Sequence, residues 1–259
     1  MNEPLLEAES LSISYGQKCV VQDVSFALEP GRILVIAGES GSGKSTILKA
    51  CMGILGTRGS ICQGSIKLKG QDIASLSVSE RRKLAGSVIA MIFQNAGASF
   101  CPVRKIGEQI FDSVLAHKKW TKKQFRDRAC FICKRIHLPE SILDEYPFRL
   151  SGGMGQRAGI LAATILEPEI LLADEPTSAL DTVTQASVVN ELLELRNSSG
   201  LSIIMVTHNL GIAWRIADDI LIMRRGKMVE FGTKEKIFSN PEQHYTKELI
   251  SAVPALNRI

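Results

Sequence analysis

A glycine-rich segment at residues 38–45, Gly-Glu-Ser-Gly-Ser-Gly-Lys-Ser, constrains the fold of this chain more than any other feature. It fits the pattern G-x-x-x-x-G-K-[S/T] at every fixed position. The apolar, branched run at residues 32–36 comes just before it and predicts a buried strand. A helical pattern follows from Thr46. This strand–loop–helix context predicts a loop whose backbone N–H groups surround phosphates at the positive end of a helix.

The residue types in this loop match the chemistry of phosphate binding. Glycines let the backbone wrap closely around an anion. Lys44 is expected to reach the β- and γ-phosphates of a nucleotide, and the Ser45 hydroxyl to bind Mg²⁺. An accidental glycine-rich turn is the alternative, but it would not explain the matching strand and helix on both sides.

A second part of the site is predicted at residues 170–175, where an apolar strand ends in Asp174 and Glu175. A phosphate loop needs a partner carboxylate for Mg²⁺, and Asp174 is placed to supply it. Glu175 can polarise a water molecule as a general base. The alternative is a solvated strand end, which the presence of the phosphate loop disfavours.

The chain of 259 residues is 45% hydrophobic and 22% charged, which is typical of a globular protein with a sizeable core. No apolar run approaches the roughly 20 residues of a membrane span. The start Met1-Asn2-Glu3-Pro4 lacks the pattern of a secretory signal, so we expect a cytoplasmic protein. Strands are predicted at residues 5–15, 20–26, 32–36, 87–93, 170–173, 201–206, 219–223 and 228–231. Helices are predicted from Thr46, over residues 104–166 with breaks at Pro139 and Pro147, and at residues 182–196 and 210–217.

Strands that alternate with helices predict an α/β fold with a parallel sheet, and the helical block in the middle predicts a second lobe. The six cysteines are expected to be free thiols. Cys130 and Cys133 form a single C-x-x-C, with His137 nearby. Zinc needs about four ligands, and no second pair exists. Cys133 shares a helical face with apolar neighbours, so we expect it in the core.

Net charge is +4, and the excess is concentrated in residues 118–135, the basic segment. Eight basic residues and one acid give this segment a charge of +7, so the rest of the chain carries −3. A solvated helix face is the favoured interpretation. A surface for anionic lipid or an acidic partner is the alternative. Nucleic acid is disfavoured, because the segment has few aromatic residues and no RNA-binding motif.

Leu150-Ser151-Gly152-Gly153-Met154 resembles the signature motif of ATP-binding cassette (ABC) ATPases, which usually reads LSGGQ. Further motifs follow the family's order over nearly the whole chain. Tyr15 matches the aromatic residue that stacks on adenine, Gln94 the Q-loop glutamine, residues 178–181 the D-loop, and His208 the switch histidine. The resemblance implies Glu175, His208 and Lys44 as catalytic residues, and Ser45, Gln94 and Asp174 as Mg²⁺ ligands. It implies an ATP site made of Tyr15, Gly38, Glu39, Ser40, Gly41, Ser42, Gly43, Lys44, Ser45, Thr46, Gln94, Ser151, Gly152, Gly153 and Asp181.

The resemblance also implies an architecture. This is the P-loop NTPase fold, with a mixed or parallel sheet core, an N-terminal antiparallel β subdomain and a helical subdomain inserted at about residues 95–165. The nucleotide-binding domain is expected at residues 5–253, and a C-terminal segment of the oligopeptide/nickel type at residues 232–256. Two such domains pair head to tail, so that the signature motif of one closes over the ATP held by the other.

One cassette with only 107 residues between Lys44 and Ser151 is typical of a separate importer ATPase. The implied partners are two membrane permease subunits, a second ABC ATPase and, indirectly, an extracytoplasmic solute-binding protein. We expect a peripheral protein on the cytoplasmic face of the membrane, with no nucleic-acid partner. The alternative is a non-transport ABC ATPase that acts on nucleic acid or the ribosome.

The signature continues as Gly155-Gln156-Arg157, which resembles the SGGM-x-QR form of dipeptide, oligopeptide and nickel importer ATPases. Residues 146–148, Tyr-Pro-Phe, resemble their lead-in to the signature. The stretch at residues 240–249 resembles their C-terminal N-P-x-H-P-Y-T-[KR]-x-L motif without its second proline. No cysteine follows Cys133 before the last residue, which favours the shorter members that import nickel or metal chelates. Nickel, metal chelates and di- or oligopeptides are therefore the expected solutes.

Overall fold

The structure is a computed structural model that describes residues 3–178 and 180–253. The chain forms two compact units: unit 1 comprises Met1–Arg82 and Gly200–Ile259, and unit 2 comprises Lys83–Ser199. Ala179 of the expected D-loop, residues 254–256 of the expected C-terminal segment and the first two residues lie outside the described part of the chain.

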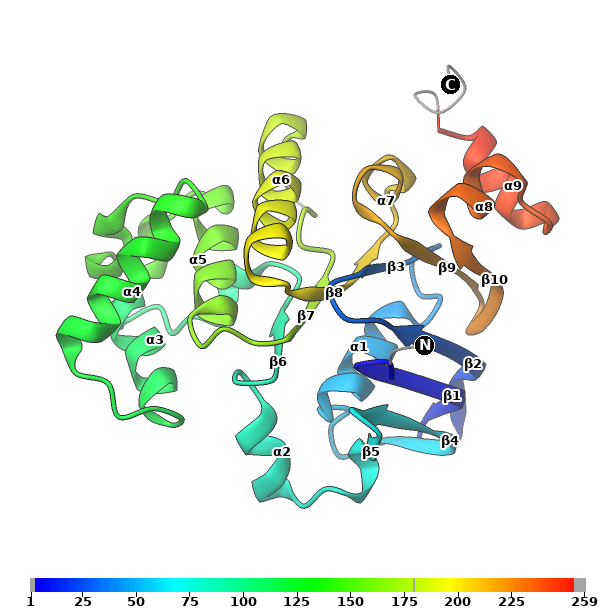
Figure 1. The fold of residues 1–259 in the computed structure, drawn as a ribbon, viewed down its shortest axis with the longest axis horizontal. Helices are drawn as coiled ribbons and strands as arrows, with labels where there is room; N and C mark the ends of the chain where they lie inside the picture. Colours follow the sequence, from blue (N-terminus) through cyan, green and yellow to red (C-terminus); the bar gives the residue numbers. More distant parts are fainter. Residues whose placement is uncertain (1–2, 179, 254–259) are drawn as a thin grey trace. The chain divides into compact units, whose positions relative to one another are not determined.

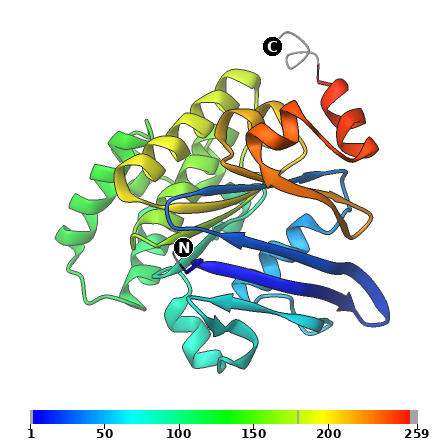
Figure 2. The same ribbon diagram turned by 45° about the vertical axis from the view of Figure 1, so that its right-hand side comes forward.

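Unit 1 contains eight described strands in the order β5-β4-β1-β2-β10-β9-β3-β8. Pairs β1–β2, β1–β4, β4–β5 and β9–β10 are antiparallel, and β3 is parallel to both β8 and β9. Figures 1 and 2 show the long antiparallel strands side by side in blue and cyan. Their bounds are β1 Leu6–Tyr15, β2 Lys18–Leu28, β3 Ile33–Gly38, β4 Gly59–Leu68, β5 Gln71–Asp72, β8 Ser202–Thr207, β9 Asp219–Arg224 and β10 Lys227–Thr233.

The parallel strands β3 and β8 are buried along their whole length, because helices of an α/β fold cover both faces of such strands. Five helical elements belong wholly to unit 1: α1 Lys44–Met52, η1 Ile73–Ser75, α7 Leu210–Ile216, α8 Lys234–Ser239 and α9 His244–Ser251. In Figure 1, α8 and α9 follow the end of β10 in orange and red. Helix α2, Val78–Leu84, spans the boundary between the units.

Unit 2 combines two parallel strands with a group of helices, drawn in green to yellow in Figure 1. Strand β6, Ile89–Ile92, pairs with β7, Ile170–Asp174. The remaining elements are η2 Ala96–Ser99, α3 Ile106–Leu115, α4 Lys122–Arg135, η3 Glu140–Asp144, η4 Pro147–Arg149, α5 Gly152–Thr164 and α6 Thr182–Ser199. Pro139 is the N-cap of η3 and Pro147 is the first residue of η4, so the breaks predicted at these prolines are confirmed.

The predicted strands are confirmed to within a few residues at each end, and with them the α/β class and the antiparallel N-terminal subdomain. The helices are confirmed as well, except that the block predicted over residues 104–166 has a further break at residues 116–121, between α3 and α4. Cys133 is buried on the apolar face of α4, and all six cysteines are free. Within residues 3–178 and 180–253, no helix is long and apolar enough to cross a membrane.

Candidate functional site

The loop between β3 and α1 has a backbone that only glycine tolerates at its two ends. Gly38 has φ 147°, and a Cβ atom there would lie 2.1 Å from the backbone oxygen of Met223. Gly43, the N-cap of α1, has φ 98°, and a Cβ atom would lie 3.0 Å from the backbone oxygen of Val20. No side chain caps α1, so no side-chain oxygen covers the positive end of this helix.

Lys44 lies folded into this loop rather than extended into solvent. Its side chain is buried, and Nζ donates hydrogen bonds to the carbonyl oxygens of Gly38 at 2.8 Å and Glu39 at 2.7 Å. Ser45 and Thr46, the next two residues of α1, are half-buried. The ammonium group is therefore held at the mouth of the loop, where it can attract a phosphate oxygen.

His208 directly follows β8, and the strand register places it at the same edge of the sheet as the loop. Ala37, one residue before Gly38, pairs with Thr207, one residue before His208. His208 is exposed, and the next residue, Asn209, caps α7 by accepting from the N–H groups of Gly211 and Ile212. The structure therefore brings the switch histidine and the phosphate loop, which are far apart in sequence, to one edge of unit 1.

Tyr15 ends β1 and is half-exposed, as expected for a ring that contacts a ligand. It pairs with Lys18 of β2 and Gly59 of β4, and a Cβ atom at Gly59 would lie 2.9 Å from the Tyr15 ring. The absence of a side chain at Gly59 therefore makes room for the ring.

In unit 2, the structure brings Gln94 and Glu175 together from positions 81 residues apart. Gln94 follows β6 and Glu175 follows β7, and the two strands are parallel, with Ile92 opposite Ala173. The Gln94 amide Nε2 donates to Glu175 Oε2 at 3.4 Å. Asp174, the last residue of β7, is buried, whereas Glu175 is half-buried and has φ 45°. The two adjacent carboxylates therefore lie in different surroundings, which suits two different roles.

The signature residues open helix α5. Ser151 is the N-cap, and its Oγ accepts from the N–H of Met154 at 3.3 Å. Ser151 and Gly152 are exposed, and Gly153 is half-exposed. The helix therefore presents its positive end on the surface, where it can act on an anion.

Asp181 directly precedes helix α6, and its carboxylate caps the start of this helix. Its carboxylate accepts from the N–H groups of Val183 and Thr184 at 3.0 Å, and from the Thr184 hydroxyl at 2.6 Å. The Thr184 hydroxyl, followed by the backbone N–H groups, lowers the pKa of Asp181. This carboxylate therefore fixes the end of the D-loop as an N-cap.

Sequence patterns did not reveal that the segment after Gln94 packs directly on helix α5. A Cβ atom at Gly97 would lie 3.2 Å from the Cα of Gly155, and one at Gly159 would lie 2.3 Å from the Cβ of Ala96. Gln156 is buried, and its Oε1 accepts from the N–H of Ala96 at 3.3 Å. The sequence signal for this close packing was the pair of glycines at positions 155 and 159, which lie one turn apart on the same face of α5.

The same part of unit 2 carries a groove of about 360 Å³. Phe148 at its edge is 70% exposed and stacks on Tyr146 with ring centroids 5.6 Å apart. Phe100, half-buried, is the other aromatic residue that lines it. The full lining comprises Asn95, Gly97, Ala98, Phe100, Pro102, Pro147, Phe148, Leu150, Ser151, Gly152 and Gly155.

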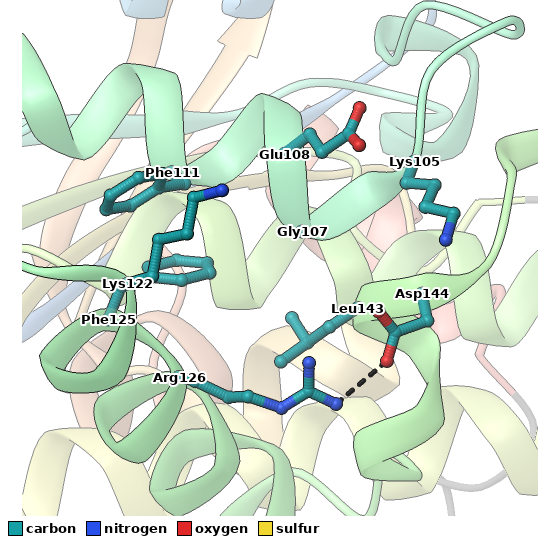
Figure 3. Close-up of a pocket in the computed structure, with 9 residues that line it drawn as sticks. All are labelled: Lys105, Gly107, Glu108, Phe111, Lys122, Phe125, Arg126, Leu143 and Asp144. Carbon is teal, nitrogen blue, oxygen red and sulfur yellow. Dashed lines mark hydrogen bonds and ion pairs between the residues drawn. The ribbon is translucent and has the colours of Figure 1, made fainter.

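The basic segment is partly neutralised by acids elsewhere in unit 2. Arg126 pairs with Asp144 at 2.8 Å, Arg128 with Glu167 at 2.5 Å, and Lys134 with Glu140 at 3.3 Å. These pairs favour the solvated helix face as the interpretation of this segment. The Arg126–Asp144 pair lies beside a separate pocket of about 210 Å³, opposite the rings of Phe111 and Phe125 (Figure 3). None of the predicted nucleotide-site residues lines that pocket.

The residues at the site fit a nucleoside triphosphate with Mg²⁺. A loop whose ends Gly38 and Gly43 leave no room for a Cβ atom, a helix start without a side-chain cap and a buried lysine suit phosphate oxygens. The predicted Mg²⁺ ligands, Ser45 in unit 1 and Asp174 and Gln94 in unit 2, carry oxygen groups of the kind that Mg²⁺ prefers. Gln94 directs its amide nitrogen to Glu175, which leaves its amide oxygen for a cation.

Comparison with known proteins agrees with this geometry. A family model described as ABC transporter matches residues 21–178. The dipeptide transport ATP-binding protein DppD of Lactococcus lactis is 38% identical, over 98% of this chain and 75% of the relative. DppD of Escherichia coli is 37% identical, over 96% and 78%. A putative peptide import ATP-binding protein of Brucella abortus is 39% identical, over 98% and 78%.

Solved structures show the same fold. The dimeric, post-hydrolysis ATP-binding cassette MJ0796 bound to ADP and Pi is 26% identical, with a TM-score of 0.78 over 88% of this chain and 98% of that one. The cbiO1 protein of Clostridium perfringens, described as part of the ABC transporter complex cbiONQ, is 24% identical, with a TM-score of 0.80 over 99% and 98%. The chain therefore belongs to the ABC transporter family, as the ATP-hydrolysing subunit of an importer.

Proposed function

We propose that this chain binds ATP and Mg²⁺ at residues 38–45, and that hydrolysis drives the import of dipeptides or oligopeptides. The observation that carries the proposal is the glycine-built phosphate loop with Lys44 held across its mouth. The peptide solute is supported by the names of the three relatives. Nickel and metal chelates, which the sequence also predicts, stay a prediction for the same transport assay.

In this mechanism, the N–H groups of the loop and Lys44 hold the β- and γ-phosphates. Ser45, Asp174 and Gln94 would hold Mg²⁺, which would supply positive charge to the phosphate oxygens. Glu175 accepts the proton of the attacking water, and its hydrogen bond to Gln94 Nε2 orients the carboxylate. His208 contacts the γ-phosphate and the same water. Tyr15 stacks on the adenine ring.

The exposed start of α5 is the second anion site of the proposed mechanism. Ser151, Gly152 and Gly153 cover the γ-phosphate of ATP that a second ABC ATPase holds, so the two chains pair head to tail. This arrangement explains why one chain carries both a phosphate loop and a helix start with exposed N–H groups. The second chain is a paralogue or a second copy.

The groove beside the signature is the proposed contact with the membrane. Its aromatic and proline lining, with Phe148 and Val103 strongly exposed nearby, suits a short apolar helix from a permease subunit. Two permease subunits would each take one ATPase on the cytoplasmic face, and a solute-binding protein would act from the other side. Nucleic acid has no part in this proposal.

Transport by the assembled complex tests the proposed function. The chain would be co-purified with its permease subunits and second ATPase, and reconstituted in vesicles with the solute-binding protein. We expect ATP-dependent uptake of a labelled dipeptide or oligopeptide that is lost with Glu175→Gln. Uptake of nickel without peptide uptake would overturn the peptide assignment. ATP hydrolysis stimulated by nucleic acid, with no uptake of any solute, would overturn the importer itself.

A further inference from the structure

The second residue of the phosphate loop, Glu39, carries a negative charge next to the proposed phosphate site. Its Oε1 lies 3.7 Å from Nε of Arg224, the last residue of β9. The guanidinium of Arg224 lies 4.4 Å from the centroid of the Tyr245 ring. All three residues belong to unit 1, and Tyr245 comes from the C-terminal helix α9. A chain of contacts therefore connects this helix to the loop.

The ring of Tyr245 contacts Arg224, and its hydroxyl lies close to Glu39. The side chain is 7% exposed, and within the described residues its hydroxyl oxygen makes no hydrogen bond of ordinary geometry. Burial, and next the nearby Glu39 carboxylate, raise the pKa of Tyr245. A cation over the face of a buried aromatic ring is held more firmly than one in water. The ring therefore fixes the position of Arg224 beside Glu39.

Helix α9 is itself fixed to the β9–β10 hairpin. The buried carboxylate of Glu230, in β10, accepts from the N–H of Glu242 at 2.9 Å and of Gln243 at 3.2 Å. Burial by itself would raise the pKa of Glu230, but these N–H groups and Thr246 lower it overall. Lys236 adds an ion pair with Glu242 at 2.8 Å. The segment just before α9 is therefore tied to the strand that follows Arg224.

The hairpin in turn supports the phosphate loop at two further points. The N–H of Gly226, in the β9–β10 turn, donates to the carbonyl oxygen of Ser42 at 3.1 Å. Gly38 packs so closely on Met223 that no side chain fits between them. Backbone contacts therefore hold the loop against the hairpin, and Arg224 lies beside the charge of Glu39.

We propose that α9 is a brace for the phosphate loop, in which Tyr245 is a positioning residue that holds Arg224 against Glu39 and so neutralises a carboxylate that would repel ATP. This assigns a task to the C-terminal motif at residues 240–249, which the mechanism does not use. The proposal rests on the proposed role of residues 38–45 in ATP binding. It predicts that the effect of the brace on ATP affinity passes through the charge of Glu39.

Calorimetric titration of the full chain with MgATP tests the brace. Because a cation–π contact is modest in energy, Tyr245→Ala is expected to raise the Kd for ATP about threefold to tenfold. Tyr245→Phe keeps the ring and should keep the affinity of the wild type. Lys247→Ala, on the exposed side of the same helix, is the matched control and should change nothing. Equal losses for Tyr245→Phe and Tyr245→Ala would overturn the role of the ring.

A double-mutant cycle separates positioning from a general loss of structure. In the Glu39→Gln background the repelling charge is absent, so Tyr245→Ala should then change the Kd by less than about twofold. Equal losses with and without Glu39 would overturn the proposal. Arg224→Gln, at a partly exposed position, gives a second route if Tyr245→Ala unfolds: it should weaken ATP binding only when Glu39 is present.

Lys44→Ala distinguishes failure of the brace from failure of the site. If Lys44→Ala binds ATP like the wild type, residues 38–45 do not bind its phosphates, and the proposed role of the brace in ATP binding fails with them. If Lys44→Ala loses affinity while Tyr245→Ala and Arg224→Gln do not, the loop stands and the brace is overturned.

Discussion

Glu175 and Asp174 are neighbours in sequence but differ in exposure, and this difference divides their roles. Asp174, the proposed metal ligand, is buried at the end of a strand, whereas Glu175, the proposed base, is half-buried and contacts Gln94. The types of both residues were predictable, because a carboxylate pair after an apolar strand completes a phosphate loop. The contact with Gln94 was not predictable, because it depends on the pairing of two strands 81 residues apart.

Glu175→Gln keeps the shape and hydrogen bonding of the side chain but removes its basicity. We expect ATP binding to remain and turnover to fall about 10²-fold or more, the usual contribution of a general base. Steady-state phosphate release and equilibrium ATP binding, measured on the same preparation, check this. His208→Ala should act in the same direction. A near-normal rate of hydrolysis by Glu175→Gln would show that Glu175 is not the general base.

Lys44→Ala removes the ammonium that Gly38 and Glu39 hold at the mouth of the loop. Because a charge-assisted contact with the β- and γ-phosphates is lost, both ATP affinity and turnover should fall. Comparing ATP with AMP sharpens the measurement, since the loss should be confined to the nucleotide that carries those phosphates. Wild-type affinity for ATP in this variant would exclude Lys44 from the site.

At the scale of elements, the strands and helices with strong apolar patterns were predictable from the sequence, and the weakly patterned ones were not. Strand β4 went unpredicted because only two of its ten residues are buried, which leaves no clear alternation. Helices α2, α8 and α9 are short, between six and eight residues, so their periodicity is weak. The contact of α9 with the phosphate loop depends on tertiary packing, which no local pattern encodes.

A buried ion pair joins two of the predictable helices. Arg157 of α5 lies 2.9 Å from Glu191 of α6, with side chains 17% and 1% exposed. Burial raises the pKa of Glu191 even though Arg157 opposes the shift. Arg157→Met would leave this carboxylate buried without its cation, and should destabilise the fold by about 3 kcal/mol. Arg149→Met, which removes an exposed pair with Glu145, is the control and should cost no more than about 0.5 kcal/mol.

The same variant should show a pH dependence of defined sign. A carboxyl whose folded-state pKa is raised contributes full stability below its unfolded pKa of about 4.3, and loses that contribution as pH rises through the folded pKa. Without Arg157 the pKa of Glu191 rises further, so the destabilisation should be larger at pH 8 than at pH 5. Urea denaturation at both values checks this. If Arg157→Met lowered the free energy of unfolding by the same amount at pH 5 and pH 8, Glu191 would not be a buried carboxylate without a compensating charge.

At the scale of the whole molecule, function depends on partners, and Phe100 is the residue that tests the proposed permease contact. Phe100→Asp places a charge in the groove beside the signature. Because Phe100 is half-buried and lines an open surface, the isolated chain should fold and bind ATP normally, whereas assembly with the permeases should be lost. Co-purification with the membrane subunits measures this. Lys119→Asp, an exposed change that does not touch the groove, should assemble normally.

Two further outcomes decide between packing and docking at this position. Thermal unfolding of isolated Phe100→Asp at a much lower temperature than the wild type would show that Phe100 belongs to the core of unit 2. Normal folding together with normal transport would remove Phe100 from the permease contact.

Residues 96–97 pack on helix α5 through backbone and methyl groups, and the buried side chain of Gln156 accepts a hydrogen bond from the N–H of Ala96. A long side chain can absorb a displacement by changing its rotamer. Backbone and methyl groups that pack closely have no rotamers to change, so they absorb less of it. We therefore expect a shift of the segment after Gln94 to move helix α5 with it, rather than to be absorbed by changes of rotamer. Gly97→Leu would place a flexible side chain between this segment and Gly155, so we expect it to weaken the coupling between the segment and helix α5.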